Sequence, residues 1–406
     1  MNVPAMIEIF KAWIGQLFSA WDRFWFTPRY PHVLGILRIL TGAMLFYSHL
    51  VLATQLGDFL GDHAWINNTI AAQLHDGAFG PADMGRSYLW HLSNPLLLWL
   101  HHAATLLITA AFAVGFMTRV TAPAAWFLQI MYLHRLTGTL FGLDQIVTYM
   151  AMYLMLTPSG SCYSVDAWLR ERFFERRASN RKLVWLLPEC RATLAANVGT
   201  RLLQLHLCII YLFGGLAKAR GELWWDGTAM WFSVANYEYQ SINMTWIGAY
   251  PRVFSALTHL TLFWEVFYCA LVWPRLTRPI VIVIAVVVHG GIATTLGMAT
   301  FGMMMIAANF IFIEPKWLLT IQPWLATKMA PLPAVVDGPP QIASRDESEI
   351  AAREQRLAEE KEKLKQRVET LKKRERKVRR AAEKLRKRGE VLSEDFDELD
   401  EPLELR

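Results

Sequence analysis

The chain has little cysteine and little charge for its length. Its 406 residues include four cysteines, and 19% of them are charged. There is no CxxC pair and no Cys/His spacing typical of metal ligands. Cys162 and Cys190 lie in one connecting loop, whereas Cys208 and Cys269 lie inside apolar segments. We therefore expect neither a structural metal site nor a disulfide framework.

Residues 1–30 lack the short apolar run and small-residue cleavage site of a signal peptide. Apolar side chains recur there at helical spacing instead: Ile7, Phe10, Trp13, Ile14, Leu17, Phe18 and Trp21. This pattern predicts an amphipathic helix lying at the membrane interface. A helix packed on a protein core would show the same spacing.

Apolar residues are abundant. They make up 54% of the chain, which has 17 Trp, 22 Phe and 16 Met, a composition that excludes a single soluble core. Eight apolar stretches within residues 31–315 approach the length needed to cross a bilayer. We predict an all-α fold, a polytopic transmembrane helical bundle of about eight spans, near 33–56, 96–117, 120–135, 142–158, 197–218, 253–273, 279–297 and 298–314. The last two are separated by almost nothing, so one pair could instead be re-entrant.

The loops between these stretches differ in charge. The 159–196 loop carries seven Lys/Arg residues, whereas the 57–95 loop carries four Asp and one Arg. Lys and Arg concentrate in cytoplasmic loops of membrane proteins. The distribution predicts a multi-pass protein of the cell (plasma or inner) membrane, in contact with the lipid bilayer, with both termini in the cytoplasm.

The C-terminal part is highly charged. A Pro-rich linker, 316–342, precedes residues 343–392, where apolar residues recur every seven positions from Ile350 to Leu392. The companion seam positions are mostly polar, which leaves a weak coiled coil, a partner-binding helix and a solvated single helix as alternatives. This segment would serve self-association or a protein partner. It has no interleaved aromatic residues, so we expect no specific nucleic acid partner. The acidic residues 393–406 are predicted to be disordered.

Ionisable side chains are costly inside a bilayer unless they are paired or face a cavity. The predicted spans contain a short set: Arg38, His49, His101, His102, His134, Asp144, Arg201, His206, Lys218, Glu265 and His289. Arg38 and Arg201 lie near span ends, where their side chains could reach the interface. The histidines at 49, 101 and 102 are more typical of packing or interfacial residues.

Lys218, Glu265 and His289 are the strongest candidates for chemistry. Lys218 ends an apolar stretch, where partial desolvation would favour its neutral form and make it a general base. The alternative is a lysine anchored at the interface beside Trp224 and Trp225. Glu265 needs a proton or a partner at mid-span. His289 precedes two glycines that allow close helix packing.

Several of these stretches occur in the order typical of one family. Leu37-Arg38-Ile39-Leu40-Thr41-Gly42, Gly214-Gly215-Leu216-Ala217-Lys218, Trp224-Trp225-Asp226-Gly227, and His289 followed twelve residues later by Phe301 resemble the horizontally transferred transmembrane (HTTM) domain family. That family is related to the vitamin K-dependent gamma-carboxylase, and the resemblance covers about 30–315.

The resemblance implies a function and a site. Lys218 falls on the position of a lysine that deprotonates reduced vitamin K, so it implies a reduced quinone as cofactor, no metal, and an enzyme of the carboxylase or epoxidase type. Lys218, His289 and Glu265 are then the catalytic candidates. The candidates for cofactor binding are Arg38, Asp144, Trp225 and Asp226, in a pocket toward the outer leaflet.

The sequence also departs from the carboxylase pattern. Gly142-Leu143-Asp144-Gln145 has no histidine at the place where the carboxylase has one, and Gly302 replaces a proline after Phe301. A charged segment stands in place of the portion that holds the protein substrate. These departures favour the HTTM branch over a full carboxylase. They leave a second hypothesis open, a non-catalytic membrane scaffold that recruits a partner through 343–392.

Overall fold

The computed structural model describes residues 3–74, 87–174 and 185–315, and positions 317, 318, 362, 369, 370, 373, 376 and 377. The chain divides into two units, Met1–Met329 and Ala330–Arg406. Within the described residues the protein forms helices and no strand, and a β-bridge joins Arg29 to Thr193. The all-α prediction is therefore confirmed for this part of the chain.

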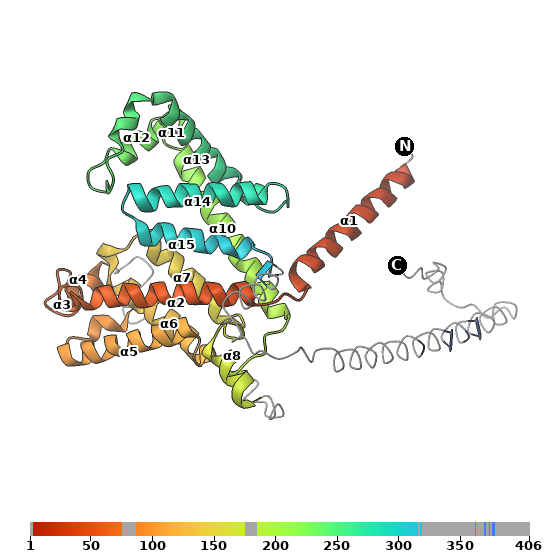
Figure 1. The fold of residues 1–406 in the computed structure, drawn as a ribbon, viewed down its shortest axis with the longest axis horizontal. Coiled ribbons are helices and arrows are strands. Elements are labelled where there is room, and N and C mark those ends of the chain that lie inside the picture. The colour runs from red at the N-terminus through yellow and green to blue at the C-terminus, as the bar shows by residue number, and fades with distance from the viewer. Residues whose placement is uncertain are drawn as a thin grey trace, which may run out of the picture. The chain divides into compact units, whose positions relative to one another are not determined.

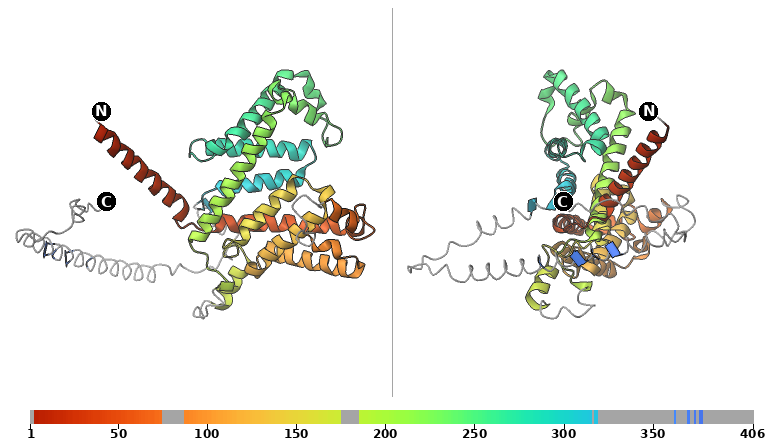
Figure 2. Two further views of the ribbon diagram at one scale, coloured as in Figure 1. Left: turned by 180° about the vertical axis from the view of Figure 1, so that it is seen from behind. Right: turned by 90° about the vertical axis from the view of Figure 1, so that its right-hand side faces the viewer.

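Each of the eight predicted apolar stretches forms a helix. The helices are α2 (His32–Ala53), α5 (Pro95–Val114), α6 (Thr118–Arg135), α7 (Gly142–Met155), α10 (Leu194–Ala219), α13 (Pro251–Leu271), α14 (Arg278–Thr295) and α15 (Ala299–Asn309). α2 packs along α5, and α14 along α15 (Figure 1). α10 and α13 form a third closely packed pair, and Figure 2 shows these helices from two further sides.

Five of these helices are long and apolar enough to cross a membrane, namely α2, α5, α10, α13 and α14. α7 has 14 residues and α15 has 11. At 1.5 Å per residue α15 rises about 16 Å, which is about half of a hydrocarbon core. α6 has Pro123 in its interior and His134 and Arg135 in its last turn. The structure thus supports a membrane protein with five candidate spans, fewer than the eight predicted.

Consecutive helices run in alternating directions. The β-bridge between Arg29 and Thr193 brings the starts of α2 and α10 together, and Arg278 at the start of α14 meets Glu314 beyond α15. Ser241 reaches the end of α14, where its hydroxyl donates to the Thr294 oxygen. We call the end at which α2, α6, α10 and α14 begin the arginine end. The opposite end, where α10 finishes, is the lysine end.

Local sequence explains where these helices begin and end. Asn94 caps α5 by accepting hydrogen bonds from the Leu96 and Leu97 amides, and Pro95 follows as the first helical residue. The helix stops at Gly115, whose φ is +73°. A Cβ at Gly115 would lie 2.0 Å from Arg38 Nη1, so space as well as conformation requires glycine there.

The 156–193 loop is tied to the arginine end by buried polar contacts. Arg38 is fully buried and donates to the backbone oxygens of Ser159 and Tyr163. Asp166 accepts hydrogen bonds from the Met117 and Thr118 amides and so caps α6. Arg38 therefore does not extend to the interface, because the folded loop supplies the acceptors that water would otherwise provide.

Cys162 and Cys190 form a disulfide across this loop, with their Cα atoms 5.5 Å apart. The expectation that the cysteines form no disulfide was wrong. The two residues are 28 positions apart in sequence, and the loop returns to its starting point because both of its ends join helices at the arginine end. Cys208 and Cys269 remain free thiols.

The remaining elements are short, apart from α1. They are α3 (Leu56–Phe59), α4 (Asn68–Gln73), η2 (Tyr88–His91), η3 (Thr137–Thr139), α8 (Val165–Leu169), the π-helical turn η4 (Arg170–Phe174), α11 (Glu222–Trp225), α12 (Ala229–Val234), η6 (Thr245–Ala249) and η7 (Phe310–Phe312). α1 (Val3–Phe26) packs on α10 and exposes Phe10, Trp13, Leu17, Phe18 and Trp21.

The C-terminal predictions fall almost entirely outside the described residues. These are the Pro-rich linker, the charged helix over 343–392 and the acidic tail. The positions described within 362–377 are helical. The interfacial position of α1 and the self-association of 343–392 stay predictions.

Candidate functional site

The lysine end contains an ion pair between α10 and α13. Lys218 Nζ donates a hydrogen bond to Glu265 Oε2 at 2.6 Å. The side chain of Glu265 is 10% exposed and that of Lys218 is 31% exposed, so the carboxylate is sheltered and the ammonium is reachable from outside. Lys218 Nζ also lies 5.5 Å from the centre of the Trp224 ring, a cation–π contact. The structure thus brings together two of the three predicted catalytic residues.

A glycine in α10 allows this pair to form. A Cβ at Gly215 would lie 2.8 Å from the Val266 backbone nitrogen, so only glycine permits the close approach of α10 to α13. Gly214 faces the pair, but a Cβ there would make only ordinary contacts, 3.6 Å from Glu265 Oε2 and 3.9 Å from Lys218 Nζ. Gly215 therefore sets the distance between the helices that carry the two charges.

His289, the third predicted catalytic residue, belongs to a different cluster. Its Nε2 is hydrogen-bonded to the Tyr211 hydroxyl at 2.8 Å. Asn309 Nδ2 donates to the same hydroxyl at 3.0 Å, and Tyr268 donates to Asn309 Oδ1 at 2.7 Å. All four residues are buried. We call Tyr211, His289, Asn309 and Tyr268 the buried polar network.

The hydrogen bonds around the Tyr211 hydroxyl tie α10 to α14 and α15. The Tyr211 oxygen accepts from Asn309 and is hydrogen-bonded to His289 Nε2. The second ring nitrogen of His289, Nδ1, is buried and has no hydrogen-bond partner within the described residues. One polar atom of the network is therefore unused in the interior of the protein.

The ion pair and the buried polar network lie along the same helix interface. Tyr211 precedes Lys218 by seven residues on α10, about 10 Å along the axis, and Tyr268 follows Glu265 by three residues on α13. No hydrogen bond joins the two groups within the described residues. Phe301 packs edge-on against His289, with ring centres 6.0 Å apart, as the spacing in the family pattern allows.

The four residues proposed for cofactor binding lie at three places. Asp144 accepts from the Phe141 amide and caps α7 at the lysine end. Trp225 donates to the Ala219 oxygen and is 55% exposed beside Phe263. Asp226 accepts from the Thr228 amide and hydroxyl. Arg38 lies at the arginine end, so the structure does not bring it to Lys218.

A second group of histidines packs between α2, α5 and α6. His102 is hydrogen-bonded to the Tyr132 hydroxyl at 2.9 Å and to the His49 backbone oxygen. His49 is hydrogen-bonded to Gln129, and His101 to Tyr88 and Tyr132. These contacts agree with the interpretation of the three histidines as packing residues.

His32, Cys162 and Cys190 place their potential ligand atoms within 4.8 Å of one another. The two sulfurs are bonded to each other in the structure, however, so neither is available as a thiolate ligand. His32 Nε2 lies 3.7 Å from Cys190 Sγ.

Tyr211, Tyr268 and Asn309 were missed because the sequence argument followed only Arg, Lys, His, Asp and Glu side chains. A search for every hydrogen-bonding side chain inside the apolar stretches would have found Asn309, which interrupts the last of them. Tyr211 carries a signal too, because it stands two helical turns before Lys218 on the same face.

Comparison of the chain with protein-family models, curated proteins and solved structures gives no match. The resemblance to the HTTM family therefore stays a prediction that rests on the sequence stretches alone.

Proposed function

We propose that this protein is a membrane enzyme in which Lys218 and Glu265 exchange a proton with a lipid-soluble substrate that bears phenolic hydroxyls, such as a reduced quinone. The observation that carries the proposal is the ion pair between these residues, one of them sheltered from solvent, at the interface of two apolar helices. Ionisable pairs are rare in such surroundings and commonly mark functional sites.

The geometry supports a role for Lys218 as the base. When the Lys218 ammonium passes one proton to the Glu265 carboxylate along their hydrogen bond, a neutral amine and a neutral acid remain. Low-dielectric surroundings favour this neutral arrangement. Lys218 then takes the phenolic proton at Nζ, and Glu265 holds the first proton. The pair has then gained one proton in total, and it returns to its starting state when Glu265 releases that proton to water.

The surface beside the pair suits a planar aromatic ring. Phe263 and Phe267 on α13 are about half exposed, with ring centres 6.5 Å apart, and Trp225 packs edge-on against Phe263. Phe263 and Phe267 lie on α13, the helix that carries Glu265, and Trp225 lies on α11, which follows the end of α10 that carries Lys218. The residues therefore fit a reduced quinone, which would supply the acidic hydroxyl. The histidine that the carboxylase has near the position of Asp144 is absent from this sequence, so an epoxidation step would need another group.

The arrangement in the membrane forms part of the same proposal. The helices α6, α7 and α15 complete an eight-segment bundle with the five candidate spans, in which residues 28–30 before α2 and residues 313–315 after η7 lie at the arginine end. Arg119, Arg275 and Arg278 in the turns of that end favour the cytoplasmic side of the cell membrane.

The test uses purified full-length protein in lipid nanodiscs with vitamin K hydroquinone and oxygen, and measures quinone binding and epoxide formation. We expect the wild type to bind and convert the hydroquinone, and Lys218→Met to lose conversion. Arg220→Met is the matched control, because it removes an exposed cation two residues away without changing the ion pair. If the wild type neither binds the hydroquinone nor forms epoxide, the proposal is refuted.

A further inference from the structure

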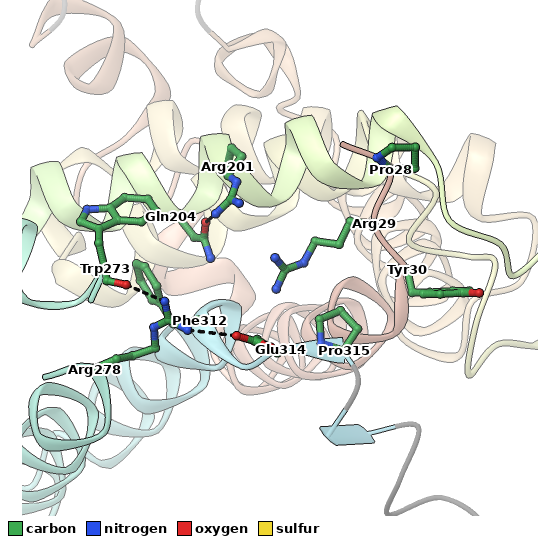
Figure 3. A pocket seen from close by; sticks show the side chains of 10 residues that line it. All are labelled: Pro28, Arg29, Tyr30, Arg201, Gln204, Trp273, Arg278, Phe312, Glu314 and Pro315. Atoms are coloured by element: carbon green, nitrogen blue, oxygen red, sulfur yellow. Dashed lines mark hydrogen bonds and ion pairs between the residues drawn. The ribbon is translucent and has the colours of Figure 1, made fainter. Parts of the chain in front are cut away.

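A cavity of about 290 Å³ opens at the arginine end, far from Lys218 along α10. Its walls come from four segments that are distant in sequence: residues 28–30, α10, residues 273–278 at the turn into α14, and residues 312–315 at and after the end of η7. Its volume is close to the lower limit of small-molecule sites, about 300 Å³. Figure 3 shows the guanidinium group of Arg29 pointing into the space between Arg201 and Glu314.

The cavity carries an excess of positive charge. Arg29, Arg201 and Arg278 line it, and Glu314 is the carboxylate among its lining residues. Glu314 pairs with Arg278, whose Nη1 lies 3.6 Å from Glu314 Oε1. Within the described residues, no carboxylate lies within 4.0 Å of Arg29 or Arg201. Two guanidinium groups therefore face the cavity without an anionic partner of their own.

Each of these two arginines is held in place by other contacts. Arg29 Nη2 donates to the Ile313 oxygen, and the Arg29 backbone is fixed by the bridge to Thr193. Arg201 donates from Nε to the Phe24 oxygen and stacks on the Phe24 ring at 4.3 Å. These contacts leave several N–H donors of each guanidinium unused, since each has five. The donors are positioned before any ligand arrives.

Burial and repulsion between neighbouring arginines destabilise the charged form of Arg29. Burial, followed by repulsion from Arg201, lowers the pKa of Arg29 to about 10, while Glu314 acts in the opposite direction. Arg29 therefore stays charged at neutral pH. An anion in the cavity would relieve both effects.

We propose that this cavity binds the phosphate group of a phosphate monoester or of free phosphate, with Arg29 and Arg201 as its ligands. Forked N–H donors match the oxygens of phosphate better than those of other common anions. The buried Gln204 amide lies beside Arg201 and accepts its Nη1 bond, which keeps that guanidinium turned toward the cavity. Arg278 already pairs with Glu314, so we do not assign it as a ligand. It contributes only to the positive charge of the cavity.

Two sources of phosphate are available at this end of the molecule. The cavity opens beside α1, whose exposed Trp13, Leu17 and Trp21 suit the boundary between headgroups and acyl chains. A lipid phosphate in that layer and a soluble phosphate in the adjoining water would both reach Arg29.

The test measures binding to the purified full-length protein in detergent. The probes are phosphatidic acid, diacylglycerol with the same acyl chains, and inorganic phosphate, with binding followed by native mass spectrometry and by displacement of labelled phosphatidic acid. We expect phosphatidic acid to bind and diacylglycerol not to bind. If inorganic phosphate displaces the lipid, soluble phosphate is also a ligand; if it does not, the lipid is the ligand.

Substitutions separate this proposal from a purely structural role. Arg29→Gln and Arg201→Gln should each weaken phosphatidic acid binding at least about tenfold, the loss expected for one charge-assisted contact. Glu314→Gln should tighten binding, because it removes the opposing charge while keeping a similar shape. Arg275→Gln, an exposed residue in the adjacent turn, is the matched control and should change little.

The sign of the Glu314 effect keeps the test decisive if Arg201→Gln fails to fold. Binding that is equal for phosphatidic acid and diacylglycerol, or that weakens equally in Arg29→Gln and Arg275→Gln, would overturn the proposal. So would weaker binding in a folded Glu314→Gln protein.

Discussion

The Lys218 ammonium and the Glu265 carboxylate meet at 2.6 Å across the α10–α13 interface, although 47 positions separate them in sequence. Each group would be unstable in this place alone, because a charge left without a partner in apolar surroundings loses its hydration and gains nothing in return. The pairing explains how a glutamate is tolerated in the middle of an apolar helix.

This relationship predicts how single and double substitutions behave. Glu265→Gln leaves the Lys218 charge unpaired, and Lys218→Met leaves the Glu265 charge unpaired. Each should lower the free energy of unfolding by about 1–2 kcal/mol, less than for a fully buried pair because Lys218 is partly exposed. The double variant should recover most of this loss, since no unpaired charge remains. Thermal unfolding of the wild type, the two single variants and the double variant in the same lipid measures these changes in stability.

The double variant also separates stability from function. We expect it to be as stable as the wild type yet inactive toward the hydroquinone. A double variant that is no more stable than Glu265→Gln would show that the two side chains act independently.

A second prediction concerns the close approach of α10 to α13. Gly215→Ala places a methyl group 2.8 Å from the Val266 backbone nitrogen, so the helices must separate. We expect a loss of about 1–3 kcal/mol in the free energy of unfolding, as for other overpacked interiors. The separation should also lengthen the Lys218–Glu265 contact and reduce activity. Thermal unfolding and hydroquinone conversion report the two effects.

Gly290→Ala is the matched control in α14, where an added methyl group would meet nothing within 4 Å. It should leave stability unchanged or raise it slightly, because alanine favours the helix over glycine. Equal losses in the two alanine variants would refute the packing argument.

The positions of the helices could be predicted from the sequence more fully than the contacts between them. All eight apolar stretches form helices, because hydrophobic length and Gly/Pro punctuation are local properties. The number that span the membrane was less predictable: the apolar stretch 298–314 is long enough to suggest a span, but its α-helix α15 has only 11 residues.

The candidate site was predictable only in part. Lys218 and Glu265 were found because buried charges are conspicuous in an apolar chain, but nothing local shows that they pair. Asn309 escaped because it has no charge. The Cys162–Cys190 bond and the arginine cavity depend on how distant segments return to one end of the bundle, and spacing alone does not reveal that.

A third prediction addresses the buried polar network. Tyr211→Phe removes the hydroxyl that binds His289 and accepts from Asn309, so His289 Nε2 loses its partner and Asn309 Nδ2 loses one of its two acceptors. Such losses cost about 1–3 kcal/mol each. We expect a clear fall in the melting temperature of the protein in nanodiscs.

Tyr149→Phe supplies a close comparison. Its hydroxyl is buried on α7 and has no hydrogen-bond partner within the described residues, so its removal should be neutral or stabilising. Matching decreases in the two phenylalanine variants would show that the network contributes no specific stability.

The last prediction decides which side of the membrane the arginine end faces. Arginine-rich loops indicate the cytoplasm, whereas a disulfide such as Cys162–Cys190 persists in oxidising compartments. The two sulfurs are close enough to bond on either side, so the compartment sets their oxidation state in cells.

With the arginine end in the cytoplasm, we expect both cysteines to be reduced in living cells and to bond after purification in air. A chain carrying Cys208→Ala and Cys269→Ala, quenched in acid and alkylated with a heavy maleimide, should gain two labels from cells and none after oxidation. The further change Cys162→Ala should give one label under both conditions. Absence of label in protein taken directly from cells would place the arginine end on the oxidising side.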